Sequence, residues 1–203
     1  LRRKYHIKHL VVCDILPKFV TSLEENMTMR KDQLVKQLNL LPLSTEGGFF
    51  KETYRSCLTT GEKEDERSLL TAIYYLVSSD TGGRNYLHRN KSDHIHFFHC
   101  GWPLEYTIIS PENEIKKFVL GPDPNKGDMF QLTVNGWHLK AARLMTERTE
   151  CESFPNEIPF ALISEAVAPG FEYKDRWCFD RKEVETLFEP ELSAKLLEHL
   201  PPQ

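Results

Sequence analysis

The sequence lacks a long apolar run, a cysteine framework and the common phosphate-binding loops. Its five cysteines are spread over 203 residues without a C-x-x-C pair, which argues against a disulfide scaffold and against a cysteine zinc site. The apolar segment from Leu10 to Leu16 is interrupted by Asp14 and is too short for a membrane span or a secretory signal core. No G-x-G-x-x-G or P-loop pattern occurs, so nucleotide binding through such loops has no support.

The charge is also modest, because the formal net charge is only -4. A chain without an excess of basic residues has no broad electrostatic reason to bind nucleic acid, and we expect neither a nucleic-acid nor a membrane partner. Unpaired cysteines favour a reducing compartment, so we expect an intracellular, cytoplasmic protein. The basic start, Leu1 to His9, fits either the remnant of a transit peptide or a boundary other than the natural start.

Histidine is concentrated in one segment, His88 to His99, which holds four of the eight histidines. Imidazole suits both divalent metal binding and proton transfer near neutral pH. His94 and His96 are two residues apart, so in a β-strand both side chains point to the same face, whereas His99 points to the other. The chemistry of the protein is therefore expected to involve this segment.

Short apolar segments separated by turn residues indicate a mainly β protein with a helix at each end. A helical pattern runs from Thr28 to Leu41 and another from Arg181 to Leu200. Asn135-Gly136 is expected to form a hairpin-like turn, and Thr146 to Pro159 an exposed loop. Seven further segments are predicted strands: Phe49–Ser56, Leu69–Ser78, Leu104–Ser110, Ile115–Leu120, Met129–Val134, Trp137–Met145 and Phe160–Val167. This pattern is typical of an all-β sandwich or barrel.

Several motifs, in order along the chain, resemble the cupin family Cupin_5 (DUF985). They are Glu46–Ser56, Thr71–Leu76, His88–Asp93, Gly101–Leu104, Ala141–Leu144 and Val167–Tyr173. The resemblance implies a cupin jelly-roll β-barrel, usually a homodimer, with a small-molecule pocket in its mouth. It divides the chain into an N-terminal extension (1–27), the cupin domain (28–185) and a C-terminal helix (186–203) that packs on the barrel.

The histidine segment departs from the family pattern Ser-Asp-Glu-Ile-Trp-His-Phe. His94 stands where the family has the acid, His96 replaces the tryptophan and Phe97 replaces the histidine. A ligand set inherited from the family therefore cannot be transferred unchanged. Since a cupin metal site takes two or three histidines and one carboxylate, His94, His96 and His138 are candidate ligands for iron, manganese, nickel or zinc. Glu105 and Glu52 are the candidate carboxylates; alternatively, the histidines bind no metal and fill a polar interior.

Other candidates line the expected pocket. His88, His94 and Tyr75 are candidate catalytic residues for proton transfer. Tyr74 and Tyr75 must face opposite sides of one strand, so one of them belongs to the core. Arg55, Tyr54, His96 and Phe171 are candidate ligand-binding residues. The guanidinium of Arg55 suits an acidic substrate, but an ion pair at the barrel edge or at a dimer interface explains it equally well.

Three functions remain open at this point. The first is an epimerase- or isomerase-like enzyme that acts on a small polar metabolite, such as a sugar or sugar nucleotide, by histidine-mediated proton transfer. The second is a small-molecule binder or sensor that kept the fold and lost the chemistry. The third is an oxygenase that depends on a divalent metal. Jelly rolls host all three, so the fold alone does not choose between them.

Overall fold

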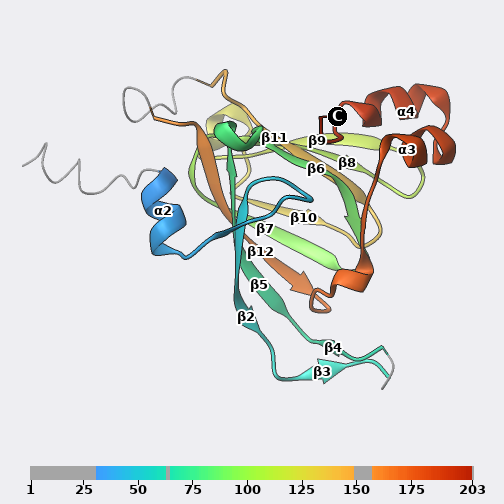
Figure 1. The fold of residues 1–203 in the computed structure, drawn as a ribbon, viewed down its shortest axis with the longest axis horizontal. Coiled ribbons are helices and arrows are strands. Elements are labelled where there is room, and N and C mark those ends of the chain that lie inside the picture. The colour runs from blue at the N-terminus through green and yellow to red at the C-terminus, as the bar shows by residue number, and fades with distance from the viewer. Residues whose placement is uncertain (1–30, 63–64, 149–156, 203) are drawn as a thin grey trace, which may run out of the picture. The chain divides into compact units, whose positions relative to one another are not determined.

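The structure is a computed structural model that describes residues 31–62, 65–148 and 157–202. Within these residues, two antiparallel sheets face each other as a jelly-roll-like sandwich (Figure 1). The first sheet contains, in spatial order, β1 (Leu41–Pro42), β2 (Phe49–Arg55), β5 (Thr71–Ser78), β12 (Phe160–Ala168), β7 (Asp93–Gly101) and β10 (Gln131–Val134). The second contains β13 (Arg176–Cys178), β6 (Arg84–Asn90), β11 (Leu139–Leu144), β8 (Leu104–Ile109) and β9 (Ile115–Leu120). A separate hairpin joins β3 (Thr59–Thr60) to β4 (Arg67–Ser68).

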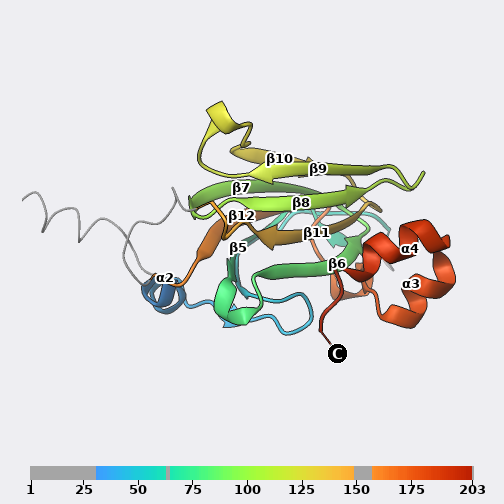
Figure 2. The ribbon, with the colours of Figure 1, turned by 90° about the horizontal axis from the view of Figure 1, so that it is seen from above.

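The all-β jelly-roll class is confirmed, but the expected closed barrel is replaced by two separate sheets (Figure 2). The hairpin expected at Asn135-Gly136 is also wrong. β10 pairs with β7 in the first sheet, whereas β11 pairs with β6 and β8 in the second. This turn therefore carries the chain from one sheet to the other, which a local turn signal cannot distinguish from a hairpin.

The first helix ends earlier than the periodicity predicted, and the C-terminal one is broken in two. α2 covers Lys31–Gln37, and Asn39 follows with a positive φ of 52°. The C-terminal helical pattern forms two helices, α3 (Arg181–Leu187) and α4 (Pro190–Leu197), so one continuous helix is wrong. Proline disfavours the helical conformation of the residue before it, which explains the break. None of the helices in the described part of the chain is long and apolar enough to cross a membrane.

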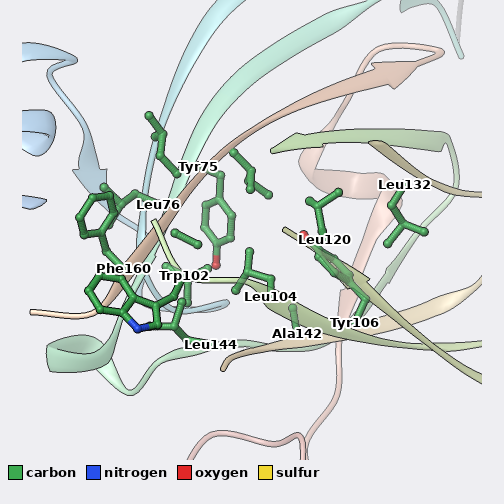
Figure 3. Packing of buried hydrophobic residues seen from close by; sticks show 14 of the residues in the cluster. Tyr75, Leu76, Trp102, Leu104, Tyr106, Leu120, Leu132, Ala142, Leu144 and Phe160 are labelled. Atoms are coloured by element: carbon green, nitrogen blue, oxygen red, sulfur yellow. The ribbon is translucent and has the colours of Figure 1, made fainter. Parts of the chain in front are cut away.

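Apolar side chains from both sheets fill most of the space between them (Figure 3). Trp102 is 2% exposed and lies against Phe160, with ring centroids 6.3 Å apart. A second cluster on the outside of the second sheet buries Val184 of α3 and Leu196 of α4 against Leu87 and Leu139. These contacts place the C-terminal helices against the outer face of the second sheet. The extension 1–27 and most of the loop 146–159 lie outside the described residues.

Candidate functional site

A cavity of about 100 Å³ is lined by both sheets and by the segments that follow β1 and β12. Apolar side chains such as Phe50, Ile73 and Val167 form part of its wall. The rest is polar, which is unusual for the interior of a sandwich. The buried polar residues among its lining are Thr71, Tyr75, His88, Asn90, His94 and Glu165, and the side chains of Glu46 and Arg176 are each 13% exposed.

β7 and β12 place two imidazoles and a carboxylate side by side. His94 and His96 face inward together, as expected from strand alternation, and are 4% and 0% exposed. Glu165 of β12 is the register partner of His96. Its Oε2 lies 3.2 Å from His94 Nδ1, and its Oε1 lies 3.4 Å from His96 Nδ1. The first sheet thus supplies the carboxylate that the sequence did not identify.

Lys140 of β11, in the opposite sheet, reaches into this group. Its Nζ lies 3.0 Å from His94 Nδ1, 3.3 Å from His96 Nε2 and 3.4 Å from Glu165 Oε2. An ammonium has three N–H donors, and these three atoms are acceptors that match them. Lys140 is 2% exposed, so its charge depends on these partners for compensation. We refer to these four residues as the lysine cluster.

The charges of the lysine cluster determine its protonation state. Burial and, after it, the charge of Lys140 lower the pKa of His94 to about 3, although Glu165 opposes this shift. Burial and Lys140 likewise lower the pKa of His96. Although burial alone raises the pKa of Glu165, the charges of Lys140 and His96 bring it well below the usual range. At neutral pH the cluster therefore contains one cation, one carboxylate and two neutral imidazoles.

The contacts of Nδ1 bear on which ring nitrogen of His94 carries the single proton. Nδ1 lies 3.0 Å from the Lys140 ammonium, which can only donate, and 3.2 Å from Glu165 Oε2, which can only accept. If Nδ1 accepts the shorter of these two contacts, from Lys140, the ring proton resides on Nε2. This Nε2 is buried and has no hydrogen-bond partner among the described residues, and His94 lines the cavity. Asn90, which also lines the cavity, has a buried Oδ1 with no partner in the part of the chain that the structure describes. A ligand with a carbonyl oxygen that accepts from Nε2–H and a hydroxyl that donates to Asn90 Oδ1 would satisfy both.

A second carboxylate that lines the cavity, Glu46, belongs to the loop before β2. Gly47 and Gly48 adopt φ values of +86° and +72°, and a Cβ on either would lie within 2.5 Å of a backbone oxygen of Arg84 or Leu76. Only glycine allows this close approach, which explains the Glu-Gly-Gly motif physically. The Glu46 carboxylate accepts a hydrogen bond of 2.6 Å from Arg176 Nη1. We refer to Glu46, His88 and Arg176 as the glutamate cluster.

His88 completes this second group from β6. Its Nδ1 lies 2.7 Å from the backbone oxygen of Tyr86, which can only accept, so Nδ1 carries the proton. Its Nε2 lies 3.4 Å from Glu46 Oε2. Burial lowers the pKa of His88, although Glu46 opposes this shift. Burial by itself raises the pKa of Glu46, but the charges of His88 and Arg176 leave it below its usual value. His88 is thus a neutral imidazole with an unprotonated Nε2 beside a carboxylate.

Tyr75 is the inward-facing member of the tyrosine pair. Its hydroxyl donates to the Gly47 backbone oxygen at 2.8 Å and accepts from Asn85 Nδ2 at 3.0 Å. It lines the cavity, but its proton is directed at the loop that carries Glu46. Tyr74 faces the other side, where its ring packs against His99 at 5.8 Å.

Arg55 and Phe171 lie at the edge of the cavity. Arg55 Nε and Nη2 donate to Glu52, at 3.1 and 2.8 Å, and Nη1 donates to Glu172 at 3.0 Å. Its Nη2 also donates to the backbone oxygen of Phe171 at 3.2 Å. The donors of Arg55 are therefore used to join β2 to the segment after β12. Of the two interpretations of this residue, the ion pair is the one present in the structure.

The remaining candidates lie away from this group. Tyr54 is 52% exposed and is not among the residues that line the cavity. His138 lies in the turn before β11, with Nδ1 3.2 Å from the backbone oxygen of Gly136. Among the described residues, the group able to ligate a metal consists of His94, His96 and Glu165, and His138 is not part of it. Of the expected carboxylates, Glu52 pairs with Arg55, and Glu105 pairs with Lys117 and Arg143.

His94, His96 and Glu165 could hold a metal ion by their donor types and spacing, since one ligand atom from each lies within 4.8 Å of the others. The position between them, however, is taken by the ammonium of Lys140. Protein ligands approach a transition metal to roughly 2.0–2.2 Å, and a cation at that position would repel the lysine. With Lys140 in place, the residues therefore do not fit a bound metal.

A jelly-roll-like sandwich with histidines and a carboxylate on its inner face defines a protein of the cupin type. The model of the family Cupin_5, described as "Cupin superfamily (DUF985)", matches residues 32–179, so this chain belongs to that family.

The chain is also similar to a known protein and to solved structures. The chain is 33% identical over 176 residues to "Uncharacterized protein YML079W" from Saccharomyces cerevisiae, covering 81% of this chain and 83% of the relative. Among solved structures, protein SO0799 from Shewanella oneidensis has a TM-score of 0.71 and 27% identity, over 87% of this chain and 100% of that one. A hypothetical protein from Leishmania major has a TM-score of 0.73 and 24% identity, over 86% and 100%.

Proposed function

We propose that this cupin is an enzyme of the isomerase or epimerase type that moves a proton on a small polar metabolite without a metal. The observation that supports it is a pair of buried imidazoles, His88 and His94, that line one cavity. His88 offers an unprotonated Nε2 beside Glu46, and His94 has a buried Nε2 without a partner among the described residues, which carries the ring proton when Nδ1 accepts from Lys140. One is a base and the other a hydrogen-bond donor, which is the combination that proton abstraction next to a carbonyl requires.

The proposed reaction begins with a carbonyl oxygen of the ligand accepting the Nε2–H of His94. His88 Nε2 then removes a proton from the adjacent carbon, and Glu46, 3.4 Å away, stabilises the resulting imidazolium. The negative charge that develops on the ligand oxygen strengthens its hydrogen bond to His94. Return of the proton to the same or to a neighbouring carbon completes an epimerisation or isomerisation. Tyr75 positions the loop of Glu46 through its hydrogen bond to Gly47.

The size and charge of the cavity favour a small neutral ligand. A volume of about 100 Å³ lies below the roughly 300–1,000 Å³ that is usual for drug-sized ligands, so we propose a monosaccharide or smaller hydroxycarbonyl compound in preference to a sugar nucleotide. Arg55 and Arg176 already pair with carboxylates, so neither demands an anionic substrate. A homodimer, implied by the family resemblance, stays a prediction that light scattering in solution can test.

Solvent deuterium exchange provides the test. The protein is incubated in D2O with a panel of aldoses, ketoses and smaller 2-hydroxy carbonyl compounds, and proton NMR follows exchange at the carbon next to the carbonyl. We expect exchange in at least one compound, and a loss of about 10²- to 10⁴-fold in His88→Asn. His99→Asn, on the outer face of β7, is the matched control and should retain full exchange. Saturable binding without exchange would instead support a binder, and exchange that survives in His88→Asn would contradict the proposed base.

A further inference from the structure

The lysine cluster holds a cation of its own among His94, His96 and Glu165, the three residues whose donor atoms could hold a metal ion. Three side chains from the first sheet converge there, and all three are nine-tenths or more buried. The fourth, Lys140, comes from the second sheet and is aligned with His88 in the pairing of β11 with β6. Just beyond this pair, the register of β11 shifts between Lys140 and Ala142. The cation is thus part of the fold itself.

The match between the ammonium and its surroundings is complete in number and in charge. Its three N–H groups meet His94 Nδ1, His96 Nε2 and Glu165 Oε2 at 3.0, 3.3 and 3.4 Å. The positive charge of Lys140 is balanced by the Glu165 carboxylate at the same 3.4 Å. These are distances for hydrogen bonds, whereas coordination to a metal is shorter by roughly 1 Å.

We infer that Lys140 substitutes for the metal ion in this chain, and that it positions His94 by donating an N–H to Nδ1, which leaves the ring proton on Nε2 for the ligand. The ammonium gives Glu165 a positively charged partner, as a metal ion would, but it has a single charge and no open coordination position. The inference concerns the buried wall of the cavity and does not require that the proposed proton transfer occurs.

Metal uptake by matched variants tests this substitution. Chelator-treated protein is dialysed against Co²⁺ or Ni²⁺ and then analysed for metal content, with the visible spectrum of bound Co²⁺ as a second readout. We expect the wild-type protein to retain far less than one ion per chain, and Lys140→Ala to gain about one, because the variant frees three donors and space between them. Lys140→Leu removes the charge but fills the space, so it should bind as little as the wild type. Lys117→Ala, on an exposed lysine of β9, is the surface control.

The gain in metal binding by Lys140→Ala must also depend on the other members of the lysine cluster. Adding His96→Ala to Lys140→Ala should abolish the uptake and the Co²⁺ spectrum. Stoichiometric metal in the wild type that disappears in His94→Ala would overturn the inference. So would a folded Lys140→Ala variant, verified by circular dichroism, that takes up no more metal than Lys140→Leu.

A measurement on the wild type keeps the inference testable if Lys140→Ala does not fold. In protein labelled with ¹⁵N-lysine, the buried ammonium should give a slowly exchanging NH3 signal, with nuclear Overhauser contacts to the ring protons of His94 and His96. Its absence under conditions where the wild type is folded would contradict the assigned arrangement. None of these readouts depends on a substrate, so failure here and failure of the proposed function can be distinguished.

Discussion

Two carboxylates that line the cavity, Glu165 and Glu46, are each paired with one cation and with histidine. They differ in where the cation stands. In the lysine cluster, Lys140 lies between the histidines and Glu165 and uses all its donors there. In the glutamate cluster, Arg176 donates to one oxygen of Glu46, and His88 lies near the other oxygen.

The two groups also differ in their access to the cavity. Glu46, His88 and Arg176 all line it, whereas His96 and Lys140 are buried outside its lining. A buried cation with every donor used holds its neighbours in one protonation state and gives a rigid wall. A histidine whose Nε2 has no proton, next to a carboxylate, can change its protonation state. The difference indicates that one group provides orientation and the other provides the proton acceptor.

The largest expected effect is on the lysine cluster. Lys140→Leu should lower the free energy of unfolding by about 3–5 kcal/mol, because it leaves the Glu165 carboxylate buried without its cation. Chemical denaturation of the single variant and of Lys140→Leu with Glu165→Gln measures this. The double variant should recover part of the loss, since it removes both charges. A single variant as stable as the wild type would show that the cluster contributes nothing to folding.

A smaller effect is expected for the arginine of the other group. Arg176→Leu should cost about 2 kcal/mol of unfolding free energy, because the side chains of Arg176 and Glu46 are each 13% exposed and solvent can partly replace the lost hydrogen bond. The same denaturation measurement compares it with Lys140→Leu. An equal loss of unfolding free energy in Arg176→Leu and Lys140→Leu would contradict the contrast between the buried lysine cluster and the group that lines the cavity.

Acid should destabilise the protein through its neutral histidines. The pKa of His94 falls from 6.5 to about 3 in the folded state, so below pH 6.5 the unfolded chain takes up a proton that the folded chain refuses. Stability therefore decreases as the pH falls, with a slope of up to about 1.4 kcal/mol per pH unit from this residue. The lowered pKa values of Glu165 and Glu46 act in the same direction at lower pH. Urea denaturation between pH 7.5 and 5 should show a shallower slope for His94→Asn; an unchanged slope would refute this assignment.

The smallest effect on stability is expected at the edge of the cavity, where Arg55 lies. Arg55→Gln should change the free energy of unfolding by less than about 1 kcal/mol, because the Arg55 side chain is 38% exposed and its partners are 41% exposed. A large loss of stability, measured in the same way, would mean that the ion pairs of Arg55 contribute as much to folding as the buried groups do.

Local patterns were sufficient for most of the strands and for the shared face of His94 and His96, because alternation along a strand needs only the strand itself. They were insufficient for the carboxylate of the site. Glu165 lies in a largely apolar segment about 70 residues from His94, and nothing in its own neighbourhood distinguishes it. Glu105 and Glu52 were equally acceptable by sequence, yet both form ion pairs with arginine. The Glu46 motif was noticed, but its partner Arg176 comes from β13, 130 positions away.

The sequence by itself determined the family, the mainly β class and the segment that carries the chemistry. Each of these depends on short-range order: motif residues, turn residues and a period of two. Only the tertiary structure decided which side chains meet across the sandwich, because that depends on the register of β12 against β7 and on the packing of the second sheet over the first. The ammonium of Lys140 among His94, His96 and Glu165 is the clearest case: a lysine in a strand is expected at the surface, and only the facing sheet provides the acceptors that allow its burial.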